Sequence, residues 1–370
     1  MQEGRAGIDG FADDLARQRK YVGGQLPSYD RVLALVAEAL SGDLGRRLQK
    51  AWARRRFDIY YERPLLLLAT LRYDALVTGP DHPLWPALAA DSPDPAAVTP
   101  AALELAFARD RPRVWHSLTR RRIQTNEVSR AVAWLWPATL AGERGRALAL
   151  CDMGCSAGLN LVADALALGW TEPATGPDPA RPLAIARDRR VVRRLGFDRG
   201  PLDASDEDDR SWLRACVWAG QRDRLANLEA ALAAFRAGMA GDAPPEIAAL
   251  DAREMPARLL ELAAADRSGA LWLAYQTLVR EYLGPSREPY LDGMRRWLSA
   301  MPPGRALWIE LEDPPHGATR ERPAALLAHL RRPDGVMLDL VLARCQYHPT
   351  EVAPEPDAVA AVRAALAAGA

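Results

Sequence analysis

The sequence predicts an α/β protein in which a helical N-terminal region precedes a mainly parallel β-sheet. Up to about residue 140, apolar side chains recur at helical spacing. After residue 146, short apolar runs alternate with helical segments. Alternating strands and helices form parallel sheets with helices on both faces. We therefore expect a helical region over 1–140 and an α/β domain over 141–370, with an antiparallel addition at the C-terminal end of the sheet.

Four segments of the first region predict helices, at 31–42, 64–77, 100–108 and 126–136. Thr99 followed by Pro100 is typical of a helix start, because threonine caps the free N–H groups and proline suits the first turn. The stretch between residues 78 and 100 is dense in proline, aspartate and glycine, which indicates a surface connection.

Five apolar runs of the second region are expected to form the parallel strands: 147–154, 191–198, 246–252, 269–277 and 305–313. The segments between them predict helices at 156–168, 211–235, 254–265 and 287–300. A last strand over 336–348 and an alanine-rich helix complete the pattern. In such folds ligands bind beyond the carboxyl ends of the strands, so the side chains at those ends are the candidates for a site.

Composition excludes several classes of protein. Forty-eight basic residues balance 48 acidic ones, so we expect no broad nucleic-acid-binding face. No apolar run reaches the length of a bilayer span, and the first residues lack a secretory signal, so we expect a cytoplasmic protein without a membrane partner. Four cysteines suggest no disulfide framework, and five scattered histidines predict no metal site.

The segment from Cys151 to Asn160 is the most informative of the chain. Asp152 ends the first expected strand, and Gly154 and Gly158 permit a tight turn into a helix. A carboxylate there repels the pyrophosphate of a dinucleotide but suits the cationic amino-acid end of S-adenosylmethionine. This favours a methyltransferase-type site, in which the pattern acid-x-Gly-x-Gly-x-Gly carries Ser156 at the middle glycine.

The sequence also resembles the DUF2332 family of bacterial proteins. The resemblance rests on six segments and covers about residues 10–350: DMGCSAGLN at 152–160, QTNEV at 124–128, GFDRGPLD at 196–203, WLRACVW at 212–218, WIE at 308–310, and ARC with the later HP between 343 and 349. The family's fold is thought to be similar to class I S-adenosylmethionine-dependent methyltransferases. The resemblance therefore implies a Rossmann-like, methyltransferase-type sheet.

On that template, Asp152, Gly154, Ser156, Gly158 and Asn160 are predicted to form the cofactor turn.

Four further residues are predicted to contact the cofactor. Asp198 ends the second strand and can accept both ribose hydroxyls, or it caps the turn that follows. Asp251 ends the third strand and can accept from the adenine amine, or it caps the next helix. Asn126 and Glu127 can close the N-terminal helices over the pocket, or they start a helix.

Catalytic residues are expected at the ends of the fourth and fifth strands. Tyr275 and Gln276 can donate hydrogen bonds to a methyl acceptor, and Glu310 can orient an amine or guanidinium or accept its proton.

The leading function hypothesis is transfer of a methyl group from S-adenosylmethionine to a small-molecule nucleophile, with the acceptor and the oligomeric state left open. A non-catalytic protein with this fold that binds a nucleotide or a protein partner is the alternative. A nicotinamide oxidoreductase is disfavoured by Asp152, and a nucleophilic role for Cys155 lacks an assigned histidine partner.

Overall fold

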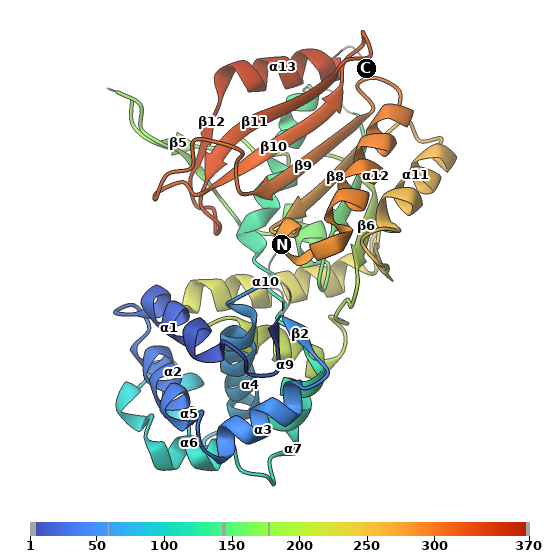
Figure 1. Ribbon diagram of the computed structural model, residues 1–370. Coiled ribbons are helices and arrows are strands. Elements are labelled where there is room, and N and C mark those ends of the chain that lie inside the picture. The colour runs from blue at the N-terminus through green and yellow to red at the C-terminus, as the bar shows by residue number, and fades with distance from the viewer. Residues whose placement is uncertain (1–4, 58, 143–145, 177, 368–370) are drawn as a thin grey trace. The chain divides into compact units, whose positions relative to one another are not determined.

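The largest β-sheet of the protein is mixed, with five parallel and three antiparallel strands among the residues that the computed structural model describes (Figure 1). Those residues are 5–57, 59–142, 146–176 and 178–367. The strand order is β12-β11-β10-β9-β8-β3-β6-β7. The expected mainly parallel sheet with an antiparallel C-terminal addition is present.

The chain forms two compact units, and each is described by itself. The first comprises residues 1–125 and 205–226, and the second 126–204 and 227–370. These differ from the expected division at residue 140, because helix α9 (Glu207–Cys216) packs on helix α4 (Glu62–Thr78) although it follows the second strand of the sheet in sequence.

The first unit is helical, with one short pair of strands. Its remaining elements are β1 (Arg5–Ala6), α1 (Phe11–Val22), α2 (Pro27–Ala39), α3 (Asp43–Trp52), β2 (Arg56–Phe57), α5 (Trp85–Leu88), η1 (Pro95–Ala97), α6 (Pro100–Ala106) and α7 (Pro112–Arg120). The expected buried helix is α4, and Thr99 caps α6 as expected, since its hydroxyl accepts from the Ala102 N–H at 3.1 Å.

The second unit contains the sheet. Its strands are β3 (Leu148–Met153), β6 (Val191–Asp198), β7 (Pro245–Ala249), β8 (Leu271–Thr277), β9 (Ala306–Glu312), β10 (Ala324–Arg331), β11 (Met337–Cys345) and β12 (Val352–Pro354), and a separate pair is formed by β4 (Thr171–Glu172) and β5 (Arg181–Pro182). Its helices are η2 (Val128–Ala131), α8 (Val132–Leu135), η3 (Pro137–Ala141), η4 (Leu159–Ala165), α11 (Met255–Ala265), η5 (Arg280–Tyr282), η6 (Gly284–Ser286), α12 (Arg287–Ala300) and α13 (Pro356–Ala367).

The structure differs from the sequence expectations at several elements, among them the helix expected over 126–136, which is the short pair η2 and α8. The helix expected over 211–235 is two helices, α9 and α10 (Arg222–Gly238), because the backbone extends at Val217 and turns left-handed at Gly220. The helix expected over 156–168 is the 3₁₀ helix η4, which is kinked at Val162. Strand β10 was not expected at all, since its run of alanines and leucines carries no alternation of polar residues.

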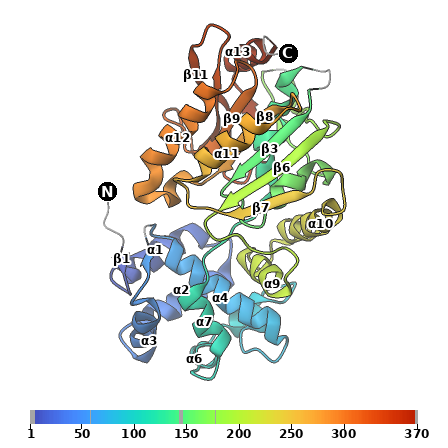
Figure 2. The same cartoon turned by 90° about the vertical axis from the view of Figure 1, so that its right-hand side faces the viewer.

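The pleat of the sheet separates two sets of buried side chains. Cys151, Trp272 and Trp308 belong to a core that they form with side chains of α11 and α12. These two helices lie beside one another along the sheet in Figure 2. The strand residues Asp152 and Tyr275 point to the other face, because successive side chains of a strand alternate. Helix α8 packs on that other face against β8 and β9.

Within the described ranges, no helix combines the length and the apolar character that crossing a membrane demands.

Candidate functional site

The carboxyl ends of the five parallel strands lie along one edge of the sheet (Figure 2). In chain order these strands are β3, β6, β7, β8 and β9, and in space they run β7-β6-β3-β8-β9. The chain therefore extends the sheet first on one side of β3 and then on the other. Such a switch point between β3 and β8 is where open α/β sheets bind ligands.

The turn after β3 is the predicted glycine turn, and its glycines are required by packing. Gly154 has φ +85°, and a Cβ there would lie 2.6 Å from a methyl group of Val279. Gly158 has φ +73°, and a Cβ there would lie 2.5 Å from Ile247. The Gly154 N–H donates to the Phe197 carbonyl at 2.7 Å, which holds the turn against β6.

Ser156 occupies the middle position of this turn in a conformation that side chains rarely adopt. Its φ is +54°, and within the described ranges Leu278, at φ +56°, is the one other non-glycine residue with positive φ. Leu278 directly follows β8. Such backbone strain costs about 1–3 kcal/mol and concentrates at functional sites. Both strained residues lie just beyond the strands that flank the switch point.

Two predicted residues hold Ser156 in place. The Ser156 N–H donates to Asp198 Oδ2 at 2.9 Å, and the Asn126 side-chain amide donates to Ser156 Oγ at 2.5 Å. The structure therefore brings Asn126, Ser156 and Asp198 together. Asp198 also accepts from the Gly200 N–H through Oδ1 at 2.9 Å, so it caps the turn after β6, which was the alternative left open. A carboxylate oxygen has two lone pairs, so both oxygens keep capacity to accept from a ligand.

Asp152 is a buried carboxyl group, 2% exposed, and no cation is paired with it in the described part of the chain. Burial raises its pKa to about 8, opposed by the hydroxyl of Tyr275 and reinforced by the charge of Asp198. Neither Asp152 Oδ2 nor the Tyr275 hydroxyl makes a well-formed hydrogen bond to another described residue. Asp152 Oδ2 can therefore accept a hydrogen bond from a ligand, and the Tyr275 hydroxyl can donate one. Buried polar atoms otherwise find partners within the protein.

The other predicted cofactor residues lie in different surroundings. Asn160 is buried in η4, and its Oδ1 has no hydrogen-bond partner among the described side chains and backbone groups. Asp251 lies two residues beyond β7 and accepts from the backbone and side-chain N–H groups of Arg253. These bonds lower the pKa of Asp251, which is partly exposed, and its carbonyl starts the turn into α11.

Glu127 and His348 form a contact that the sequence analysis did not predict. Glu127 is 4% exposed, and its Oε2 lies 3.3 Å from His348 Nδ1. The side chain of Arg130 donates to the Tyr347 carbonyl at 3.0 Å. The segment at 126–130 therefore lies beside a segment more than 200 residues later. Both residues lie in segments that resemble the DUF2332 family, which could have pointed to the pair. No rule of sequence spacing predicts that they meet.

Gln276 and Glu310 are completely buried on the α12 face of the sheet, opposite Tyr275. The Gln276 amide donates to Glu312 at 3.0 Å and accepts from the Tyr290 hydroxyl at 2.5 Å. Glu310 is paired with the guanidinium of Arg280, and its Oε1 lies 2.8 Å from His329 Nε2.

The three residues expected to be catalytic are therefore divided between the two faces. Glu312, which is not among the predicted site residues, lies in the same network as Gln276.

Cys155 is buried in the glycine turn, and burial raises the pKa of its thiol well above the usual value. It is therefore protonated at neutral pH, which weakens the nucleophile alternative.

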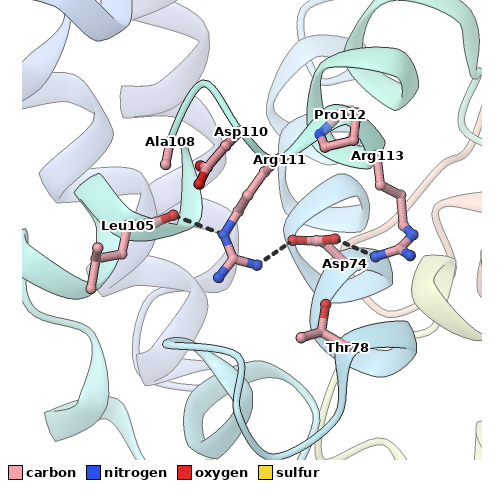
Figure 3. A pocket seen from close by; sticks show the side chains of 8 residues that line it. All are labelled: Asp74, Thr78, Leu105, Ala108, Asp110, Arg111, Pro112 and Arg113. Carbon is pink, nitrogen blue, oxygen red and sulfur yellow. Dashed lines mark hydrogen bonds and ion pairs between the residues drawn. The ribbon is translucent and has the colours of Figure 1, made fainter.

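The first unit contains a separate hollow of about 410 Å³, lined by residues of α4, α6, α7 and the α6–α7 connection (Figure 3). Asp74 forms its floor, and Arg111 and Arg113 donate to the two oxygens of Asp74 at 2.8 and 2.7 Å. Burial opposes ionisation of Asp74, but hydrogen bonds from His82, Arg111 and Arg113 prevail and lower its pKa to about 2. The charge of Asp74 is thus balanced within the protein.

Three carboxylates of the first unit, Asp206, Asp208 and Asp209, have oxygens within 4.8 Å of one another. Asp208 and Asp209 are both paired with the guanidinium of Arg121, which supplies their counter-charge.

Comparison with known proteins agrees with the sequence motifs. The family model described as "Uncharacterized protein conserved in bacteria (DUF2332)" matches residues 12–353. No curated protein and no solved structure matches the chain. Because the match spans nearly all of the sequence, including the glycine turn and the Glu127–His348 contact, the chain belongs to the DUF2332 family.

Proposed function

We propose that the second unit binds S-adenosylmethionine at the switch point and that the protein transfers its methyl group to a small-molecule nucleophile. The spatial order of the parallel strands, third-second-first-fourth-fifth, is that of Rossmann-like sheets, and a methyltransferase-type fold is part of this proposal. The antiparallel strands β10, β11 and β12 extend this core on the side of the fifth strand.

One observation carries the proposal. A buried carboxyl group with an unsatisfied oxygen, Asp152, lies at the switch point, and strained backbone follows both flanking strands at Ser156 and Leu278. An orphaned carboxyl oxygen in a buried site fits an ammonium group and does not fit a phosphate. Asp152, as a hydrogen-bond acceptor, therefore suits the amino-acid end of S-adenosylmethionine and disfavours a dinucleotide.

The other roles follow from position. Asp198 and Asn126 adjoin Ser156 and would line the ribose side of the ligand. Asp251, beyond the end of β7, would line the adenine side. Tyr275 beside Asp152 would orient the acceptor by donating a hydrogen bond. S-Adenosylmethionine, when bound, supplies an electrophilic methyl group. The residues of this chain would contribute orientation and exclusion of water, which account for much of the rate of such transfers.

Gln276 and Glu310 would not contact the ligand in this proposal, because both are completely buried on the α12 face of the sheet, opposite Tyr275. Glu127, in contact with His348, remains a predicted cofactor-side residue, since it directly follows Asn126 in sequence.

Calorimetric binding tests the proposal. S-Adenosylmethionine and S-adenosylhomocysteine should bind the wild-type protein and NAD should not. Asp152→Asn should weaken both adenosyl ligands by on the order of 30-fold or more, because the ammonium of the ligand would bind the ionised form of Asp152 and asparagine cannot ionise. Asp292→Asn, the same substitution at an exposed surface pair on α12, should leave the affinity unchanged.

Failure of both adenosyl ligands to bind would overturn the proposal. Binding without methyl transfer to any of a panel of amines and guanidines, followed with labelled cofactor, would favour the alternative of a non-catalytic nucleotide-binding protein.

A further inference from the structure

The starts of the parallel strands form the edge of the sheet opposite the proposed ligand site. Strand β3 lies between β6 and β8, and β9 follows β8. An arginine stands within two residues of the start of three of these strands, Arg146 before β3, Arg189 before β6 and Arg305 before β9. Neighbouring strands lie about 5 Å apart, so side chains as long as arginine can meet across them.

The side chains of Arg146 and Arg305 both reach over the start of β8. Arg146 Nη1 donates to the Gly304 carbonyl at 2.5 Å, so its guanidinium extends from β3 to the residue before Arg305. Arg146 Nη2 donates to the Leu366 carbonyl of α13 at 3.0 Å. From the other side, Arg305 Nη2 lies 3.5 Å from where a Cβ on Gly269 would stand, two residues before β8. The two guanidinium groups therefore occupy the same region.

Arg189 adds a third positive charge from the other side of β3. The Leu148 N–H donates to the Arg190 carbonyl at 2.9 Å, which fixes the chain next to Arg189 at the start of β3. The Nη1 atom of Arg189 is buried and has no hydrogen-bond partner in the described part of the chain. Buried donors nearly always have an acceptor, so this nitrogen indicates a place for one.

No carboxylate of the described residues forms an ion pair with this arginine cluster of Arg146, Arg189 and Arg305. Burial lowers the pKa of Arg146, and the positive charges of Arg305 and Arg189 lower it further. Asp266 lies within the field of Arg305, but its oxygens accept from Ser268 and from Trp272 Nε1. The three like charges therefore repel one another, and a bound anion would relieve that repulsion.

We propose that the arginine cluster binds a phosphate group, either free or carried by a larger molecule. Guanidinium groups recognise phosphate oxygens through paired N–H donors. A phosphate group offers three acceptor oxygens and up to two negative charges, which suits three arginines better than a carboxylate with two oxygens and one charge. The cluster and Asp152 lie at opposite ends of β3, so this site does not depend on the binding of S-adenosylmethionine.

Calorimetry and thermal unfolding with inorganic phosphate test the site. Each phosphate concentration is compared with sodium chloride of the same ionic strength. Phosphate should bind the wild-type protein and raise its unfolding temperature above that in chloride, because a ligand of the folded state stabilises it. Arg189→Gln and Arg305→Gln should each weaken phosphate binding by about tenfold or more. Arg258→Gln, an exposed position of α11, is the matched control and should bind phosphate as the wild type does.

The repulsion within the cluster gives a second measurement that needs no ligand. At low salt and without phosphate, Arg189→Gln and Arg305→Gln should unfold at a higher temperature than the wild type, because each removes one of three repelling charges. The gain should shrink as chloride is added, since salt screens the repulsion. A lower unfolding temperature of both variants would show that their charges are balanced within the protein, and would overturn the inference.

The phosphate titration can also overturn the inference. Wild-type protein that responds to phosphate no more than to chloride has no such site. Equal weakening in Arg258→Gln would show that phosphate binds only through the general charge of the surface. An equal response to succinate at matched ionic strength would overturn the assignment to phosphate.

Two further comparisons complete the test. Tighter binding of glycerol 3-phosphate than of inorganic phosphate would show that the group is carried by a larger molecule, and the reverse order would identify the free anion. The affinity for S-adenosylhomocysteine should be unchanged in Arg189→Gln. Absence of S-adenosylhomocysteine binding to the wild type would refute the proposed function and leave the phosphate test as decisive as before.

Discussion

Two buried aspartates, one in each unit, show how differently this protein treats a carboxyl group. Asp74 in the helical unit is surrounded by donors from His82, Arg111 and Arg113, and its pKa is lowered to about 2. Asp152 in the sheet unit has no such partners among the described residues, and its pKa is raised to about 8. Both are nearly inaccessible.

The difference in the partners of the two aspartates indicates a structural role for Asp74 and a functional role for Asp152. A buried carboxylate with its full set of cations contributes to the folded state. A buried carboxyl group without such cations lowers the stability of the folded state. Groups whose pKa is shifted in this way concentrate at functional sites. The proposed site therefore lies at Asp152, and not at the hollow that Asp74 lines.

The largest effect should come from removing Asp74. Asp74→Asn leaves the charges of Arg111 and Arg113 without a partner and should destabilise the protein by about 3 kcal/mol. Urea unfolding at pH 7 measures this. Asp43→Asn, which breaks exposed pairs with Arg46, Arg47 and Arg109, should cost less than about 1 kcal/mol. Equal effects of the two substitutions would show that Asp74 is not a structural centre.

The second prediction concerns Asp152, whose raised pKa should make the stability of the wild-type protein depend on pH. The folded protein keeps a proton on Asp152 up to about pH 8, whereas the unfolded chain loses it near pH 4. Stability therefore falls as pH rises through this window, by about 1.4 kcal/mol per pH unit from this group.

Asp152→Asn removes that slope. Its unfolding free energy relative to wild type should rise by roughly 2–3 kcal/mol from pH 6 to pH 8. Parallel pH profiles of the two proteins would contradict the raised pKa of Asp152.

Acid should reduce the destabilisation that Asp74→Asn causes. Its lowered pKa stabilises the folded state above pH 4, and this contribution is lost as pH falls through about 2. The stability difference between wild type and Asp74→Asn should therefore shrink by on the order of 2 kcal/mol between pH 5 and pH 2. A difference that stays constant in acid would mean that the arginines do not lower the pKa of Asp74.

The smallest effect concerns the strained turn. At Ser156, glycine should be more stable than alanine by about 1 kcal/mol, because only glycine adopts positive φ without strain. Ser299 in α12 is the matched control, where alanine should be more stable than glycine by a similar amount. Thermal unfolding of the four variants checks both signs, and the same sign at both positions would contradict the left-handed backbone of Ser156.

The sequence alone was sufficient for much of the architecture. The parallel strands were predicted because their apolar runs are continuous, as in strands buried on both faces. Asp152, Asp198 and Ser156 were predicted to share one edge because the carboxyl ends of parallel strands meet there, and the structure links the last two by a hydrogen bond.

Tertiary structure decided the rest. The side of β8 that each of Tyr275 and Gln276 faces depends on the pleat, so neighbours in sequence belong to different networks. The contact of Glu127 with His348, and the hydrogen bond from the Val279 N–H to Glu312, join residues that no local pattern relates. The raised pKa of Asp152 has the same origin, since burial and missing partners belong to the folded chain and not to any motif.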